Sequence, residues 1–483
     1  MKSSNIIAGI DLGSSKVSIV VARPVSDSGN YTLEVLGFGT SPLPKGAVVN
    51  GSVENIVQVA ESLAKALQQV ANVVHYPFDT VNVSFGGLNV KVIEQKDEII
   101  RPTSSSGEEV TENDIAQLIS EVTRVRKQKD SNYDVIHVLP RYFIVDNVGN
   151  ITEPVGRQGI KLGGDFLVIS GNSQSLKRTR KSLEMVEGNL KDANIVYSPV
   201  ATGLAVLTEE EKQAGIALVD IGEQTTDLVI YQNNFVRHVA SFPIAGKNIT
   251  NDLKTGCGIQ LSNAEDLKCT FGAALAENVP SNIEISINYL SGRPPRKVLK
   301  KNVAMIIEER LKEIAAMVYG EIKHQGLEEE LIGGIVLTGG TSSIPDIETL
   351  FSRVMDNMNV RVGLPEGLDH TSMADIVSSL SYTSAVGLAW ASIKPLDERL
   401  VSRKPIKIVS PERTPIRGRE ESIFKTPGQT QYDRPGTEDH SSQDRSSGSK
   451  IDLGGWLERI KNTFINNPRD PNDGGSYGDE DER

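Results

Sequence analysis

Cysteine is scarce in this sequence. Its 483 residues include only 2 Cys, Cys257 and Cys269. Their spacing fits no zinc or redox motif, and two thiols are too few for a disulfide scaffold. The 6 His are scattered without ligand-like spacing, so we expect no structural metal site. The composition predicts two unpaired thiols in a reducing compartment.

Long apolar runs are also missing. No stretch approaches the roughly 18 to 20 apolar residues of a membrane-spanning helix, and the N-terminus lacks the apolar core of a signal peptide. The formal net charge is −12, and no basic face or stripe indicates a nucleic-acid binder. We therefore expect a cytoplasmic protein that binds no nucleic acid.

Two segments repeat the same pattern. IDLGSSKVSIVV near the N-terminus aligns without a gap with VDIGEQTTDLVI in the middle of the chain, so that Asp11 falls on Asp220 and Gly13 on Gly222. Short β-branched runs separated by Gly turns are typical of strands. We interpret the repeat as a duplicated strand–turn–strand unit, which predicts two similar α/β lobes that face a shared cleft.

Apolar spacing predicts several helices. One runs over Ser52–Val70, with Ser52 as its N-cap. A second opens at Thr111, where Asp114 three residues on forms a capping-box pattern. A long amphipathic helix is expected over Val303–Ile322.

The two repeated turns carry the chemistry. Successive N–H groups of a Gly turn form a concavity that binds anions, and a carboxylate at the end of a strand suits a hydrated magnesium ion. A hairpin without a ligand would explain either turn alone, but it does not need Asp-x-Gly twice. The predicted phosphate-binding residues are Gly13, Ser14, Ser15, Lys16, Gly222, Thr225 and Thr226, and the residues predicted to face magnesium through water are Asp11 and Asp220.

A third element is LTGGTSSIPDI, which begins at Leu337. An apolar strand ends in Gly339-Gly340, and Gly lets a flat adenine ring approach the backbone closely. A plain strand-to-helix turn would explain the pattern equally well.

In this order and spacing, the three motifs resemble those of the actin, sugar-kinase and heat-shock-chaperone ATPase superfamily. Within it the chain resembles the bacterial FtsA family, over about residues 1 to 396 and again near the C-terminus. The resemblance implies an α/β, two-lobed actin-like ATPase fold with duplicated ribonuclease-H-like domains, ATP and Mg²⁺ as ligands, and at most weak ATPase activity. The adenosine-binding residues that it implies are Gly246, Lys247, Glu265, Lys268, Gly339, Gly340 and Ser342.

The same resemblance, together with composition, suggests a division into segments. Lobe 1 is expected at 1–87 and 165–199, with an inserted FtsA-type subdomain at 88–164. Lobe 2 is expected at 200–250 and 330–379, with a small subdomain at 251–329 and a return helix at 380–396. A disordered linker at 403–450, an amphipathic helix at 451–467 and an acidic tail at 468–483 complete the chain.

One departure from the family concerns Ser198, which precedes Pro199. Many relatives carry Glu at this position, where it can orient the attacking water. Without that carboxylate we expect slow hydrolysis, with ATP acting mainly as a conformational ligand.

The segment Ile451–Asn467 carries an apolar stripe at helical spacing with basic flanks. We expect it to bind the inner face of the cytoplasmic membrane, although docking on the folded body or on another protein would explain the same pattern. The residues of the stripe are Leu453, Trp456, Leu457, Ile460 and Phe464.

The resemblance also implies partners: other copies of the chain in a filament, further divisome proteins at the septum, and the C-terminal tail of the tubulin-like FtsZ. Arg296 and Arg310 fall where the family has basic tail-binding residues, although such residues are often only solvated. Two other functions remain open. A small-molecule kinase would need a catalytic base in the cleft, and no motif in the sequence supports one. A pilus-assembly scaffold would generally lack the C-terminal helix.

Overall fold

The computed structural model describes residues 5–27, 30–101, 109–186, 190–287, 294–369, 372–394 and 396. All of them fall within one compact unit, Met1–Arg419. The predicted linker, amphipathic helix and acidic tail therefore lie outside the described residues. Among the described helices, none is both long and apolar enough to cross a membrane.

Lobe 1 is built on a five-stranded sheet with the strand order β11-β6-β1-β2-β3. Strand β1 pairs antiparallel with β2 and parallel with β6. Helices α1 (Ile56–Ala71) and α3 (Ser173–Glu184) and the small hairpin β4 (Val48–Val49) and β5 (Ser52–Val53) complete the lobe. The sheet strands are β1 (Ile7–Leu12), β2 (Lys16–Asp27), β3 (Asn30–Pro42), β6 (Thr80–Phe85) and β11 (Asn194–Tyr197).

Lobe 2 repeats this topology in a second five-stranded sheet of order β14-β13-β12-β17-β18. Strand β12 pairs antiparallel with β13 and parallel with β17. In both lobes the first hairpin strand therefore sits at the centre of the sheet, and the predicted duplication is confirmed. The strands are β12 (Ile216–Ile221), β13 (Thr226–Gln232), β14 (Phe235–Phe242), β17 (Ile335–Thr338) and β18 (Val360–Val362).

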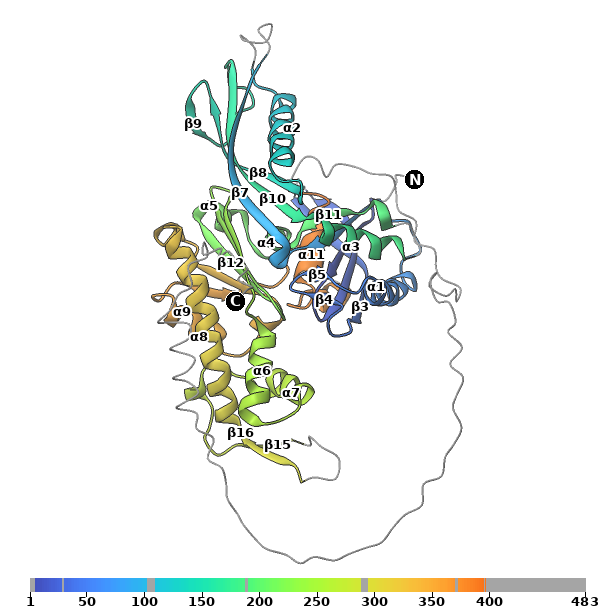
Figure 1. The fold of residues 1–483 in the computed structure, drawn as a ribbon, viewed down its shortest axis with the longest axis vertical. Coiled ribbons are helices and arrows are strands. Elements are labelled where there is room, and N and C mark those ends of the chain that lie inside the picture. The colour runs from blue at the N-terminus through green and yellow to red at the C-terminus, as the bar shows by residue number, and fades with distance from the viewer. Residues whose placement is uncertain are drawn as a thin grey trace, which may run out of the picture. The chain divides into compact units, whose positions relative to one another are not determined.

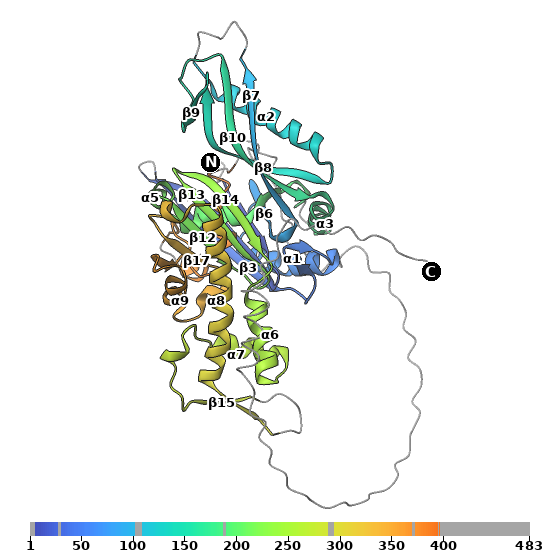
Figure 2. The same cartoon turned by 60° about the vertical axis from the view of Figure 1, so that its left-hand side comes forward.

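A small subdomain extends lobe 2. Helix α8 runs alongside α6 and α7 and contacts both (Figure 2). The predicted long helix is present, and it is longer than expected at both ends. The elements of the subdomain are α6 (Gly246–Cys257), α7 (Leu261–Phe271), η4 (Ala276–Asn278), β15 (Glu284–Ile287), β16 (Arg296–Leu299), α8 (Lys300–His324) and η5 (Glu328–Glu330). In the core of lobe 2, η6 (Gly340–Ser343) and α9 (Ile347–Val354) lie between β17 and β18.

An inserted subdomain interrupts lobe 1 between β6 and α3. Its antiparallel sheet has the order β7-β10-β8-β9, and α2 packs on one face over a separate apolar core (Figure 1). Thr111 and Asp114 form the predicted capping box at the start of α2. The elements are η1 (Gly87–Asn89), β7 (Val90–Ile100), α2 (Glu112–Lys129), β8 (Tyr133–Val145), β9 (Val148–Ile151) and β10 (Lys161–Asn172).

Two expectations about boundaries are wrong. The predicted end of the insertion at residue 164 falls inside β10, which stays paired with β7 and β8 as far as Gly171. The predicted N-cap Ser52 lies in strand β5, and the side chain of Asn55 caps α1 by accepting a hydrogen bond from the Gln58 N–H. In the first case pairing with β7 and β8 carries β10 past residue 164, and in the second pairing with the neighbouring β4 makes Ser52 part of a short hairpin.

The two lobes are joined by two short helices, α4 (Ser198–Val206) and α11 (Thr383–Trp390). They pack so closely that a Cβ on Gly387 would lie 2.3 Å from the Ala201 carbonyl oxygen. The apolar core around them combines side chains from both lobes and from the inserted subdomain. Helices α5 (Glu209–Ala214) and α10 (Ser372–Val377) and η3 (Leu190–Asp192) are the remaining elements.

Candidate nucleotide site

A pocket of about 780 Å³ lies between the lobes. The turn after β1 lines it from lobe 1, and the turn after β12 lines it from lobe 2. The starts of α4 and α11 contribute Ser198 and Ser384, and α7 contributes Glu265 and Cys269. The pocket thus brings together residues from parts of the chain that are far apart in sequence.

The two turns have the same backbone geometry. The N–H of Gly13 donates to the Lys16 carbonyl oxygen at 3.1 Å, and the N–H of Gly222 donates to the Thr225 carbonyl oxygen at 3.0 Å. Each turn is thereby fixed as a tight loop at the end of a buried central strand, the arrangement in which backbone N–H groups can cradle an anion. The pocket is lined by Gly13, Ser14, Ser15, Lys16, Gly222 and Thr225 from the predicted phosphate set.

Carboxylates gather at the base of the pocket. Burial raises the pKa of Asp220 to about 7, and the negative charges of Asp227 and Asp11 add to the rise. Burial also raises the pKa of Asp11, against a hydrogen bond from Ser84 and the charge of Lys16. Because buried acidic groups that repel one another are stabilised by a cation, this donor set fits a magnesium ion.

Sequence reasoning missed Asp227. Its pKa is raised by burial to about 6, and hydrogen bonds from Ser241 and Thr225 oppose the rise. In the repeat, Asp227 stands opposite Asp220 in the β12–β13 register, whereas Ser18 occupies the equivalent place opposite Asp11 in lobe 1. The alignment therefore already paired Asp227 with the uncharged Ser18, which marks it as a carboxylate that only the second repeat carries.

Three predicted residues stand behind the pocket wall. Thr226 is fully buried, and its hydroxyl donates to the Ile244 carbonyl oxygen at 2.6 Å. The Ser342 hydroxyl donates to the Thr338 carbonyl oxygen at 2.6 Å and holds the turn after β17. Gly246 donates its N–H to the Gly222 carbonyl oxygen. None of these three is among the residues that line the pocket, so a direct contact with the nucleotide stays a prediction for them.

The remaining predicted adenosine residues line the pocket. Lys268 is buried, and its ammonium donates to Glu265, to the Thr250 hydroxyl and to the Gly246 carbonyl oxygen. Burial works to raise the pKa of Glu265, but hydrogen bonds from Thr250 and Lys268 outweigh it, so this pKa is lowered and the carboxylate stays charged. Lys247, Gly339 and Gly340 lie along the same wall.

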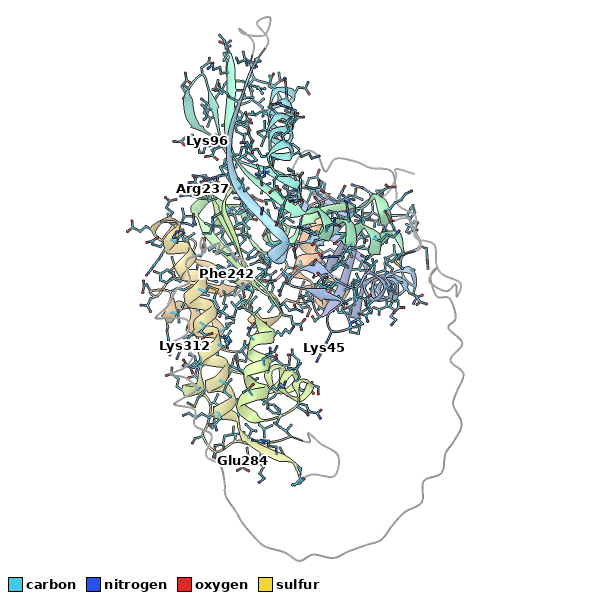
Figure 3. All side chains as sticks on the ribbon, viewed as in Figure 1. Lys45, Lys96, Arg237, Phe242, Glu284 and Lys312 are labelled. Atoms are coloured by element: carbon cyan, nitrogen blue, oxygen red, sulfur yellow. The ribbon has the colours of Figure 1, made fainter. Side chains whose placement is uncertain are left out.

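Two further residues of the pocket, one acidic and one an amide, were not predicted as site residues. Glu223 carries a buried carboxylate oxygen without a hydrogen-bond partner, and burial and the charge of Glu265 raise its pKa. The charges of Lys247, Lys268 and Lys45 oppose that rise. Lys45 projects from the loop before β4 on the side that faces α6 and α7 (Figure 3). Gln224 follows Glu223 and is almost fully buried.

The predicted tail-binding arginines differ in environment. Arg310 is 12% exposed and pairs with Asp252 and Glu313, so its guanidinium is engaged between α6 and α8. Arg296 lies on β16 against Gly258, where a Cβ would come within 3.0 Å of a guanidinium nitrogen. Arg296 and Arg310 are both half-buried, but the guanidinium of Arg310 is held by two carboxylates of the small subdomain.

Comparisons with known proteins agree with this geometry. The model of the family described as cell division protein FtsA matches residues 217–387, and that of the SHS2 domain inserted in FtsA matches residues 87–170. The cell division protein FtsA of Pseudomonas aeruginosa is 31% identical over 80% of this chain and 89% of its own length. That of Escherichia coli K12 is 28% identical over 79% of this chain and 89% of its own length.

Among solved structures, a chain of a PilM–PilN type IV pilus biogenesis complex is similar with a TM-score of 0.55 and 15% identity. The match covers 80% of this chain and 99% of that one. Two equivalent lobes around one pocket, with short helices between them, define the class: an actin-like α/β protein. The family matches and the relatives make the assignment specific: the chain belongs to the FtsA family of cell-division proteins.

Proposed function

We propose that this protein binds ATP with Mg²⁺ in the pocket between its lobes. The observation that carries the proposal is the pair of equivalent turns, each following an Asp at the end of a central strand and both lining one pocket. The turns would hold the phosphates. Gly339, Gly340, Glu265 and Lys268 would contact the adenosine.

Asp11 and Asp220 would hold the magnesium ion through its water ligands, since Mg²⁺ keeps several waters and favours carboxylate oxygens. The ion would supply positive charge that the buried carboxylates and the phosphates both need. Ser198, at the start of α4, offers a hydroxyl where a carboxylate could orient water. ATP would therefore act mainly by holding the cleft in its closed state, with slow hydrolysis.

The family assignment supports a wider role in division. We propose that the ATP-bound protein forms filaments, binds the C-terminal tail of the tubulin-like FtsZ and other divisome proteins, and tethers the FtsZ ring to the inner face of the cytoplasmic membrane at the septum. The membrane contact is assigned to residues 451–467, on the strength of their apolar stripe. One short segment should bind reversibly, and several copies on a filament should bind by avidity.

Arg296 is proposed as the main contact for the acidic tail of FtsZ. Lys297, Lys300 and Lys301 are close to it in sequence and would add long-range attraction. Arg310 would act indirectly, because its pairs with Asp252 and Glu313 hold α8 against α6. Charge reversal of Arg296 should abolish FtsZ recruitment, whereas reversal of exposed Lys127 on α2 should leave it unchanged.

The membrane role is tested by co-sedimentation with anionic liposomes in the presence of ATP and Mg²⁺. The full chain is compared with a chain that ends at Lys450 and with Trp456→Glu, and Asn462→Gln serves as a matched control. The full chain and the control should pellet with lipid, and the other two should stay in solution. If the full chain also stays in solution, residues 451–467 form a protein-docking helix and the tether is rejected.

A further inference from the structure

Gln224 lies in the turn that lines the pocket from lobe 2, but its side chain reaches into lobe 1. Its carboxamide oxygen accepts a hydrogen bond from the Asn50 N–H at 3.0 Å. Its carboxamide nitrogen donates to the Val48 carbonyl oxygen at 3.4 Å. Both partners belong to the β4–β5 hairpin, whose Val48 and Val53 are packed in the core of lobe 1. One side chain thus makes a two-point contact across the cleft.

Because Gln224 is buried, losing this contact would be energetically unfavourable. Only 7% of the residue is exposed, and a buried amide is unfavourable unless its donor and acceptor are both satisfied. Here the satisfying groups belong to the opposite lobe. A movement that separates the lobes would break both hydrogen bonds together, so this side chain favours the closed arrangement.

The hairpin that Gln224 holds is also the support of the inserted subdomain. The Asn50 carbonyl oxygen accepts a hydrogen bond from the Leu88 N–H at 3.1 Å, and Leu88 stands two residues before β7 begins. Gly51 has a φ of +80°, and a Cβ there would lie 2.4 Å from the Gly86 carbonyl oxygen. The backbones at Asn50–Gly51 and Gly86–Leu88 are therefore in direct contact, with no space between them for adjustment.

We propose that Gln224 is a positioning residue that clasps the two lobes over the nucleotide and links closure of the cleft to the root of the inserted subdomain. The path runs from the second phosphate turn through Gln224 to Asn50, and from Asn50 to Leu88. Gln224 itself and its neighbours Glu223 and Thr225 line the pocket, so a ligand that orders this turn also orders the clasp. The link to ATP rests on the proposed function, whereas the clasp itself does not.

The chain offers a control with the same hydrogen bonds on the exposed surface of one lobe. Gln69 makes the same two-point contact with the Thr40 backbone, donating to its carbonyl oxygen at 2.8 Å and accepting from its N–H at 2.9 Å, but both residues belong to lobe 1. Gln224→Met and Gln69→Met each remove one such contact while keeping side-chain length. Gln224→Glu keeps the acceptor for Asn50 and loses the donor to Val48, so it separates the two bonds.

The experiment is hydrogen exchange of the full chain, with and without ATP and Mg²⁺, together with the dissociation rate of a fluorescent ATP analogue. In the nucleotide-free protein, Gln224→Met should speed exchange of the Asn50 amide about tenfold, and Gln224→Glu should speed it less. With ATP, the wild type and Gln69→Met should gain protection over residues 86–92. Gln224→Met should lose that gain and release the analogue roughly five- to tenfold faster.

Unchanged exchange at Asn50 in the nucleotide-free Gln224→Met protein would overturn the clasp. Faster exchange at Asn50 with ATP-dependent protection of residues 86–92 intact would overturn the link to the inserted subdomain. If the wild type fails to bind ATP, the proposed function is rejected, and exchange in the nucleotide-free protein still decides the clasp. A single cooperative unfolding transition in Gln224→Met excludes a general loss of folding as the cause.

Discussion

Gly339 lies directly against Asp220. A Cβ built on Gly339 would stand 2.2 Å from the Asp220 Oδ1 atom, and the φ of Gly339 is +85°. Both the space and the backbone conformation therefore require glycine. Gly340, the next residue, has open space where its Cβ would be, although both glycines line the pocket.

This difference predicts that two alanine substitutions affect different properties, one the stability of the fold and the other the binding of ATP. Gly339→Ala should destabilise the nucleotide-free protein by roughly 1–3 kcal/mol, because it combines backbone strain with a clash against a buried carboxylate. Gly340→Ala should leave that stability unchanged and weaken ATP binding, because the added methyl would occupy space proposed for the adenine ring. Chemical denaturation and ATP titration check both. Normal ATP affinity in Gly340→Ala would remove Gly340 from the adenosine site.

The pKa of Asp220 predicts a pH dependence. It is raised from 3.8 to about 7, so the folded state binds this proton more tightly than the unfolded state. The stability that this group provides is complete below about pH 3.8 and is lost as the pH rises through about 7. Asp227, whose pKa is raised to about 6, acts in the same direction. The nucleotide-free protein should therefore lose stability between pH 5 and 8.

Asp220→Asn should remove the part of this loss that comes from Asp220, because the amide is neutral at every pH, and leave the part that comes from Asp227. Without magnesium it should be more stable than the wild type at pH 8, by roughly 1–4 kcal/mol, and the gap should close towards pH 5. Thermal unfolding of both proteins in EDTA from pH 5 to 8.5 measures this difference in stability. With ATP and Mg²⁺ the order should reverse, since only the wild type retains the carboxylate. A gap that is the same at pH 5 and pH 8 would point to packing instead of charge.

Cys269 offers a chemical probe of the pocket. The residue is exposed and lines the cavity, although burial of the thiol and the charge of Glu265 raise its pKa, whereas Cys257 is buried and burial raises its pKa to about 11. At pH 8, N-ethylmaleimide should modify Cys269 and leave Cys257 unmodified in the folded protein. Saturating ATP with Mg²⁺ should slow the reaction at least about fivefold, which mass spectrometry of the labelled peptide can follow. A labelling rate that ATP does not change would place the nucleotide elsewhere.

The repeat in the sequence was sufficient to predict the two lobes, because a strand–turn–strand unit keeps its pattern when the surrounding helices change. Local pattern also gave the Thr111 capping box, which depends only on neighbouring residues. Thr226 shows where such reasoning fails. Successive residues of a strand point to opposite faces, so Thr225 faces the pocket and Thr226 faces the interior. The sequence alone does not say which of the two adjacent threonines faces the pocket and which faces the interior.

Arg310 and Gln224 needed the tertiary structure for a different reason. Arg310 pairs with Asp252, which lies 58 residues earlier, and Gln224 bonds to Asn50, 174 residues earlier. From the sequence, a basic residue on a helix and an amide in a turn are expected to be solvated at the surface. Only the tertiary structure shows that distant partners bury them. The predicted membrane stripe lies outside the described residues and stays a prediction.

Because Ser198 stands where a carboxylate could orient water, a single substitution at this position should raise the rate of ATP hydrolysis. Ser198 begins α4 and lines the pocket, with its hydroxyl beside Gly86. In the wild type, ATP turnover should stay below about one per minute, because no carboxylate at this place orients the attacking water. Ser198→Glu should raise turnover at least about tenfold, within the range that a positioned acid–base group contributes.

Phosphate release at saturating ATP measures both rates. Ser198→Ala serves as the matched control, since it alters the same position without adding a carboxylate and should turn over as slowly as the wild type. ATP affinity should differ little among the three proteins, which would locate the effect in the chemical step. A wild type that hydrolyses ATP many times per minute would mean that another pocket carboxylate orients the water, and Glu223, with its unpartnered oxygen, would be the first to replace.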